Sequence, residues 1–168
     1  MCIRDSSKTI PVTENAKEVA RMFLFGCFTG LSFANLVTLT FKQIEGNTVK
    51  FFREKTKTWH HVPLNETALS LIGDTFDCDP NGRIFNTPSR RYSQTLLEKW
   101  GKHAGIKKHV HMHLSRHTFA TLNLSSGADL YTVSKLIGHK KLATTQIYAK
   151  VIDSAKRKAV DALPQLKL

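Results

Sequence analysis

The most apolar stretch of the chain, residues 19–31, places the first constraint on the fold. It contains Arg21 and is shorter than the roughly 20 apolar residues that a bilayer span requires. Within residues 14–28 the apolar side chains recur at helical spacing, and Gly30 follows as a stop signal. The residues that define this spacing are Val19, Met22, Phe23 and Cys27. The stretch therefore predicts a buried helix in a folded core, and we expect no membrane partner.

Composition bounds the size and the partner of this core. With 168 residues, the chain can bury one full core but not two substantial ones. Hydrophobic residues make up 41% and charged residues 23%, which is typical of a globular protein. The 25 Lys and Arg against 13 Asp and Glu give a formal charge of +12, which favours polyanions. Nucleic acid is the leading partner, but ribosomal and membrane-surface proteins are basic too, so the motifs must decide.

The three cysteines, Cys2, Cys27 and Cys78, show no paired spacing. This pattern indicates neither a disulfide framework nor a thiolate zinc site, and it fits a reducing cytoplasm. No signal-peptide pattern opens the chain, so we expect a cytoplasmic protein.

The order of periodic segments predicts a mainly α fold with a small three-stranded antiparallel sheet. β-branched and aromatic residues predict three short strands, and the rest of the periodic segments predict helices. The strands are expected at 41–44, 48–53 and 59–64, and the helices at 14–28, 33–39, 66–72, 89–104, 114–126, 129–137, 144–150 and 153–163. Asn65 and Asp129 are expected to cap helices, and Gly127 and Gly138 to follow helix ends. Other local expectations are Ile84 and Phe85 as anchors of a polar loop, and Tyr92, Leu96, Leu97 and Trp100 on one side of their helix.

The segment His113-Leu-Ser-Arg116 places an imidazole and a guanidinium three residues apart at a helix start. Both side chains therefore lie on one face. Arginine suits phosphate because its planar fork donates two parallel hydrogen bonds and stays charged, and histidine adds a donor or a proton acceptor. The pair predicts an anion-binding site.

Two further features follow in order. Leu136-Ile-Gly-His139 places a histidine just beyond a helix end, and Tyr148 follows nine residues later. Taken alone, His139 would be interpreted as a polar residue after a helix cap, and Tyr148 as a tyrosine of an amphipathic helix. The sequence of H-x-x-R, L-I-G-H and Tyr resembles the tyrosine recombinase (phage integrase) family over residues 16–158. Residues 113–121 are similar to the second box of that family almost letter for letter.

The resemblance implies a set of catalytic roles. Tyr148 would attack a DNA phosphate, giving a 3′-phosphotyrosyl link and a free 5′-hydroxyl. Arg116 and His139 would stabilise the transition state, and His113 would accept or share the tyrosine proton. Lys55, which would otherwise be interpreted as a solvated turn residue, would protonate the leaving 5′-oxygen. Bond energy is conserved in such a transfer, so no cofactor and no metal are expected.

The first box departs from the family pattern. That pattern is T-G-L-R with an acidic residue three positions later, whereas this chain has Thr29-Gly-Leu-Ser32 followed by Asn35. Losing both charges leaves a neutral site that can still bind phosphate, which favours a divergent subfamily. Strand alternation makes Arg53 the candidate for a compensating cation, because it shares a face with Lys55 if the strand continues. Arg90 and Arg91 are the competitors.

Four other cations are expected to contact the DNA backbone: Lys140, Lys141, Arg90 and Arg91. The histidines at 109, 111, 113 and 117 form a cluster in the sequence, but no fourth ligand of fixed geometry is indicated, so it does not predict a metal site. His117 is expected to be a hydrogen-bonded helix residue.

The resemblance also implies partners and domains. We expect double-stranded DNA and other protomers, with a tetramer on DNA in the full-length protein and the segment from Asp153 docked on a neighbouring protomer. Residues 1–13 are interpreted as a truncated or artefactual start, and 14–168 as a recombinase catalytic domain without the N-terminal DNA-clamping domain. A mobile element is an expected context, but the sequence leaves open a phage, a transposon or a chromosome-dimer system. Two alternatives stay open: a DNA-binding module of the same fold without strand transfer, and a helix-turn-helix regulator.

Overall fold

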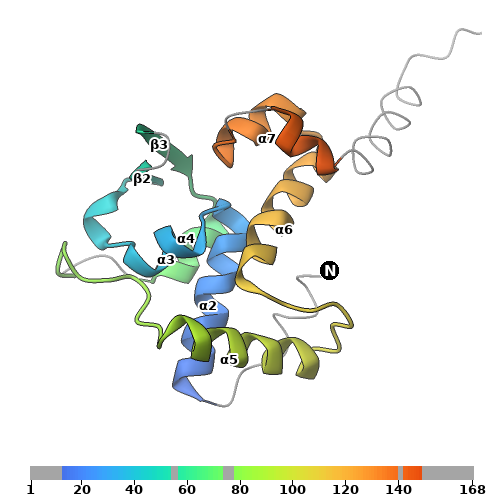
Figure 1. The fold of residues 1–168 in the computed structure, drawn as a ribbon. Coiled ribbons are helices and arrows are strands. Elements are labelled where there is room, and N and C mark those ends of the chain that lie inside the picture. Colours follow the sequence, from blue (N-terminus) through green and yellow to red (C-terminus); the bar gives the residue numbers. More distant parts are fainter. Residues whose placement is uncertain (1–12, 54–56, 74–77, 140–141, 149–168) are drawn as a thin grey trace, which may run out of the picture. The chain divides into compact units, whose positions relative to one another are not determined.

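The computed structural model describes residues 13–53, 57–73, 78–139 and 142–148. The chain divides into two compact units, Met1–Phe119 and Ala120–Leu168, and Figure 1 gives their elements. Lys55, Lys140 and Lys141 lie outside the described residues, as do the start at 1–12 and the segment from Asp153. The expectations for these residues therefore stay predictions.

The central element of unit 1 is the helix α2 (Glu14–Thr29), which matches the predicted helix at 14–28. Thr13 caps its start, since the Thr13 hydroxyl accepts a hydrogen bond of 3.3 Å from the Ala16 amide. Gly30 ends it in the left-handed region with φ of 68°. Three shorter helices follow in this unit: α3 (Phe33–Thr38), α4 (Glu66–Ile72) and α5 (Arg90–His103). The helix α2 packs against all three.

The sheet has the order β1-β2-β3 and is antiparallel throughout, as predicted. Its strands are β1 (Ile44–Glu45), β2 (Thr48–Arg53) and β3 (Thr58–Pro63). The strand expected at 41–44 is wrong, because Phe41–Gln43 forms the 3-10 helix η1. The Gln43 side chain accepts the Thr40 amide at 3.0 Å, and the Lys42 amide bonds to the Pro80 carbonyl at 2.8 Å. These bonds use amides that a strand ladder would need.

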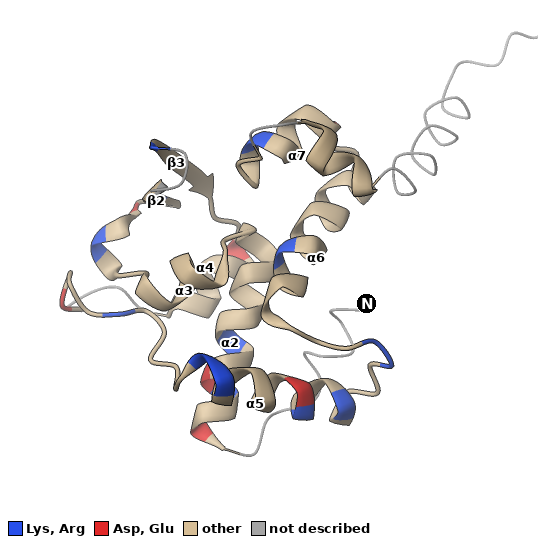
Figure 2. Ribbon diagram, viewed as in Figure 1, with Lys and Arg blue, Asp and Glu red and all other residues tan. Residues whose placement is uncertain are grey.

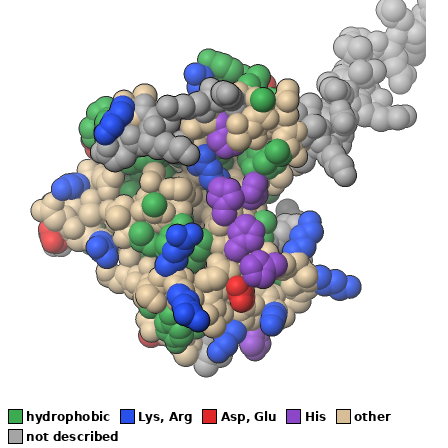
Figure 3. All heavy atoms as spheres, viewed as in Figure 1, with side chains coloured by type: hydrophobic (Ala, Val, Ile, Leu, Met, Phe, Trp, Pro, Cys, Tyr) green, Lys and Arg blue, Asp and Glu red, His purple; other side chains and the backbone are tan. Residues whose placement is uncertain are grey.

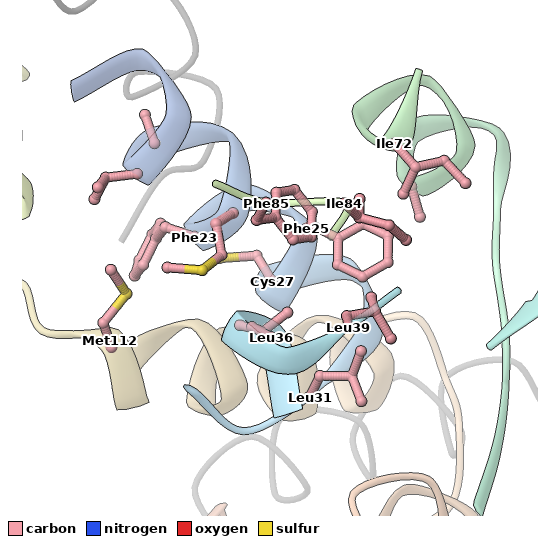
Figure 4. Close-up of a cluster of buried hydrophobic side chains, with 14 of the residues drawn as sticks. Phe23, Phe25, Cys27, Leu31, Leu36, Leu39, Ile72, Ile84, Phe85 and Met112 are labelled. Atoms are coloured by element: carbon pink, nitrogen blue, oxygen red, sulfur yellow. The ribbon is translucent and has the colours of Figure 1, made fainter. Parts of the chain in front are cut away.

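The core of unit 1 lies around α2, and aromatic and aliphatic side chains from all the helices of the unit contribute to it. Figure 4 shows the part formed with α3, α4 and the loop that carries Ile84 and Phe85. The rings of Phe25 and Phe85 lie 5.2 Å apart, which confirms Phe85 as an anchor of its loop. Ile84 is also buried. On α5 the buried face is formed by Ser93, Leu96, Leu97 and Trp100. Tyr92 is 47% exposed, so its expected place on that face is wrong: the buried positions follow i, i+3, i+4 and i+7 from Ser93, and Tyr92 lies outside this stripe.

Unit 2 contains the end of α6 (Met112–Ser125), the helix α7 (Leu130–Leu136) and the 3-10 helix η2 (Leu142–Tyr148). Asp129 caps α7 through a bond of 2.9 Å to the Thr132 amide, and Gly127 and Gly138 have φ of 95° and 63°, as predicted. The helix expected at 144–150 is a 3-10 helix where it is described, a form common in short segments. The helix α7 packs against η2.

No described helix has both the length and the apolar character that crossing a bilayer demands.

Candidate active site

The first turns of α6 carry the predicted anion-binding pair, His113 and Arg116, in unit 1. Arg116 is 8% exposed, and its Nη1 donates a hydrogen bond of 2.7 Å to the Gly30 carbonyl. A Cβ at Gly30 would come within 2.5 Å of the Phe119 ring, and the φ of 68° also disfavours any side chain there. Glycine at this position therefore allows the loop after α2 to approach α6 and to hold the Arg116 guanidinium.

His113 is exposed, and its ring meets the ring of the half-buried His117 edge-on with the centroids 4.7 Å apart. Desolvation lowers the pKa of His113 below the ordinary histidine value, and the positive charges of His117, Arg116 and His111 lower it further. The pKa of His117 is lowered in the same way, first by desolvation and then by His111 and Arg116. At neutral pH His113 is therefore a neutral imidazole with the capacity to accept a proton.

Histidine side chains gather over the start of α6, beside Lys and Arg side chains (Figure 3). His109 and His111 have stacked rings 5.7 Å apart, and His109 bonds to the Glu98 carboxylate at 3.1 Å. Within the described ranges, no three His, Cys, Asp or Glu side chains are grouped so as to hold a metal ion. Within this cluster, the pKa values of His113 and His117 are the ones lowered, by desolvation first and then by neighbouring positive charge.

In unit 2, His139 follows the end of α7 and is held by the hydroxyl of Thr145. The distance from His139 Nδ1 to Thr145 Oγ1 is 2.9 Å, and Thr145 is fully buried. A hydroxyl that donates to Nδ1 leaves the proton of a neutral imidazole on Nε2, ready to donate to an anion. Tyr148, the last residue of η2, lies three residues after Thr145 and is 6% exposed.

Sequence reasoning missed Thr145. The available signal was a hydroxyl residue placed between His139 and Tyr148, in a segment where a helical face was expected. Its contact with His139 depends on the tight turn of η2, which the pattern did not predict.

The position of the missing arginine is neutral and is used for a helix cap. Ser32 Oγ accepts a hydrogen bond of 3.4 Å from the Asn35 amide at the start of α3. The Asn35 side-chain nitrogen is buried and has no hydrogen-bond partner within the part of the chain that the structure describes. Neither residue supplies the cation or the carboxylate of the family pattern.

The remaining cations separate into two groups. Arg53 is the last residue of β2, but its side chain is not among those described. Arg90 and Arg91 form the first turn of α5, and both ends of this helix carry Lys or Arg (Figure 2). Both arginines line a cavity of about 630 Å³ together with His111 and His113. The structure thus brings two predicted DNA-binding residues and one predicted catalytic residue to one cavity of unit 1.

Comparison with known proteins defines the class of this chain. The phage integrase family pattern matches residues 6–154. The XerC tyrosine recombinase of Shewanella amazonensis is 34% identical over 163 residues, which cover 85% of this chain and 54% of that protein. A tyrosine recombinase of Pseudothermotoga lettingae is 32% identical over 146 residues, covering 82% of this chain and 51% of that protein.

Solved structures agree on the fold. The catalytic domain of bacteriophage HP1 integrase superposes with a TM-score of 0.72 at 22% identity, covering 98% of this chain and 94% of that domain. The XerH site-specific recombinase bound to palindromic difH substrate superposes with a TM-score of 0.70 at 20% identity, covering 95% of this chain and 50% of that protein. The chain belongs to the phage integrase family, and it spans about half the length of the curated relatives it matches.

Proposed function

We propose that this chain is the catalytic domain of a DNA strand-transfer enzyme, a site-specific tyrosine recombinase. The observation that supports this most is the arrangement in unit 2. His139 is oriented by the buried Thr145, and Tyr148 follows three residues later on the same short element. An imidazole oriented by a hydrogen bond, near a tyrosine in sequence and in the same unit, is the pattern expected for nucleophilic attack on phosphate.

The proposed reaction is a transesterification. The Tyr148 oxygen forms a bond to a DNA phosphorus, and the bond from that phosphorus to the 5′-oxygen of the next nucleotide breaks. The tyrosine proton passes to His113, whose lowered pKa keeps it neutral and able to accept. Lys55 gives a proton to the leaving 5′-oxygen. Attack by a second 5′-hydroxyl reverses the step and exchanges strands.

Arg116 and His139 supply the electrostatic part of the proposal. The transition state carries more negative charge on the non-bridging oxygens than the ground state does, so fixed donors stabilise it selectively. Arg116 is fixed by the Gly30 carbonyl, and His139 by Thr145. Both donors are therefore held in place before DNA arrives.

Partners follow from the chemistry and the charge. The formal charge of +12 favours double-stranded DNA as substrate. The XerH relative was solved bound to its difH substrate, which supports the same partner here. Strand exchange needs more than one nucleophile, so a tetramer on DNA is proposed for the full-length protein. Lys140 and Lys141 are proposed to contact DNA phosphates.

The test is covalent capture. The protein is incubated with a library of random duplexes nicked close to a central position, so that a cleaved strand diffuses away and traps the adduct. Protein-linked DNA is recovered under denaturing conditions and sequenced. We expect an enriched sequence with the unaltered chain and none with Tyr148→Phe, which keeps the phosphate contacts and should bind DNA with unchanged salt dependence. Binding without any adduct from the unaltered chain would favour the alternative, a DNA-binding module without strand transfer.

A further inference from the structure

We infer that Arg90 supplies the phosphate-binding cation that is absent at Ser32. The inference rests on the proposed function, and it names a further residue for the same reaction. Arg90 comes from the start of α5, far from the first box in sequence, and the two are brought together by the packing of α5 and α3 around α2.

The contact that joins them is between Arg90 and Phe33, the residue directly after Ser32. The Arg90 guanidinium carbon lies 5.5 Å from the centroid of the Phe33 ring. A cation over an aromatic face is attracted by the ring quadrupole, while the N–H groups at its edge stay able to donate. Phe33 thus orients a guanidinium beside the first box without using its hydrogen-bonding groups.

The cavity next to this contact is built for an anion. Arg90, Arg91, His111 and His113 line it, and the other lining residues are Phe33, Gln94, Thr95 and Met112. There is no carboxylate among these lining residues. A volume of about 630 Å³ admits a phosphodiester with its neighbouring sugar, and His113 places the cavity beside the proposed proton acceptor.

The position of the arginines on α5 points the same way. The first turn of a helix has a partial positive charge, so acidic residues stabilise it and basic residues destabilise it. The first turn of α5 has no acidic residue and begins with Arg90 and Arg91. Two cations at this unfavourable position are explained by an anion that they bind together with the helix start.

The neutral pair at Ser32 and Asn35 is consistent with this substitution. An arginine at position 32 would place a second guanidinium close to Arg90, and the two would repel each other. A carboxylate at position 35 would compete with DNA phosphate for Arg90. In this chain Ser32 caps α3 and Asn35 is uncharged, so these two positions present neither a second cation nor a carboxylate to Arg90.

The kinetic test uses the DNA sequence enriched by covalent capture, under single-turnover conditions with protein in saturating excess, so that weaker binding does not limit the rate. We expect Arg90→Ala to slow cleavage about 100-fold, the lower end for removing one transition-state donor. Arg83→Ala is the matched control, because Arg83 is exposed in the same unit and does not line the cavity. It should cleave like the unaltered chain.

A second substitution locates the function of Arg90. Ser32→Arg alone should not increase the cleavage rate. Added to Arg90→Ala, it should raise the cleavage rate of that variant at least tenfold, because it returns a guanidinium to the same phosphate. Arg53→Ala is the competing variant, since strand alternation makes Arg53 the other candidate. Unchanged cleavage by Arg90→Ala, or a large loss with Arg53→Ala alone, overturns the inference.

A binding measurement separates this inference from the proposed function. The affinity for a random-sequence 30-base-pair duplex is measured against salt concentration, which needs no cleavage. One lost phosphate contact lowers the slope of log affinity against log salt by about 0.9. We expect this change for Arg90→Ala and none for Arg83→Ala. If no variant forms an adduct, the proposed function fails, and an unchanged slope for Arg90→Ala then overturns the inference independently.

Discussion

The two units hold their functional residues by different means. In unit 1, Arg116 lies on a helix that packs into a large aromatic and aliphatic core, and the Gly30 loop closes on its guanidinium. In unit 2, His139 and Tyr148 lie on short elements, whose described contacts include the Asp129 cap, the left-handed Gly138 and the hydrogen bond between His139 and Thr145. Among the largest wholly buried side chains of the described residues, Ile137 alone comes from unit 2.

This difference indicates which kind of interaction fixes the position of the functional side chains in each unit. In a packed core the position of a side chain is fixed by many weak contacts, so a single steric change is felt throughout the unit. In a small unit of short elements, individual hydrogen bonds fix a ring orientation, and losing one changes chemistry more than stability. Substitutions in the packed core of unit 1 should therefore lower the free energy of unfolding, and loss of the hydrogen bond to His139 in unit 2 should lower the rate of DNA cleavage.

The largest effect on stability is expected for Gly30→Ala in unit 1. Alanine at φ of 68° costs about 1 to 2 kcal/mol, and forcing the Phe119 ring aside adds about 1 to 3 kcal/mol. Gly105→Ala is a matched control, because Gly105 has the same φ of 68° and nothing within 4 Å of the added Cβ. Denaturant unfolding should show the larger loss for Gly30→Ala. Equal losses would mean that the core adjusts freely, against the proposed contrast.

The next effect is on rate, with Thr145→Val in unit 2. Valine keeps the shape of the buried side chain but cannot bond to His139 Nδ1, so the ring loses the hydrogen bond that orients it. By analogy with other residues that orient a functional histidine, cleavage should slow about 10- to 100-fold. The affinity for DNA should not change. Single-turnover cleavage measures this effect.

Two controls make the result specific to the hydrogen bond. Thr145→Ser keeps the hydroxyl and should retain most of the rate, and Thr144→Val alters the exposed neighbour and should have no effect. A large fall in melting temperature for Thr145→Val would show that Thr145 supports packing rather than the orientation of His139. The contrast between the units would then be wrong.

The sequence predicted what local chemistry determines. The caps at Asn65 and Asp129 and the bounds of β2 and α4 were confirmed, because a side-chain oxygen, a turn or a proline sets them within a few residues.

What the sequence did not predict depends on residues that meet only in the fold. The strand expected at 41–44 became η1 because its amides bond to the carbonyls of Pro80 and Gly82. The contact of Arg90 with Phe33 joins α5 to the start of α3, and no periodicity indicates it. The bond between Thr145 and His139 depends on a 3-10 turn where an amphipathic pattern indicated a longer helix. In each instance the outcome depends on a contact between distant residues or on a tighter turn, which local preference does not determine.

The smallest effect is expected for His117→Gln, which tests the electrostatics of the histidine cluster in unit 1. The pKa of His117 is lowered in the folded protein, so between that value and the ordinary histidine pKa of about 6.5 the unfolded chain binds more protons than the folded chain. The free energy of unfolding therefore has its full value above about pH 6.5, and it decreases as the pH falls through this window. Each proton taken up on unfolding contributes at most about 1.4 kcal/mol per pH unit, and solvent screening of a partly exposed ring reduces this.

His117→Gln should lose less stability than the unaltered chain between pH 7.5 and pH 5.5, measured by denaturant unfolding at each pH. The same substitution removes one positive charge that lowers the pKa of His113, so that pKa should rise. His113 accepts a proton only when neutral, and a higher pKa makes the cleavage rate fall at a higher pH on the acidic side. His103→Gln is the control, since it removes a histidine of α5 that bonds to the Lys99 carbonyl outside the cluster. If the fall of the cleavage rate at acidic pH occurs at the same pH in His117→Gln as in the unaltered chain, His113 is not the group whose titration limits cleavage.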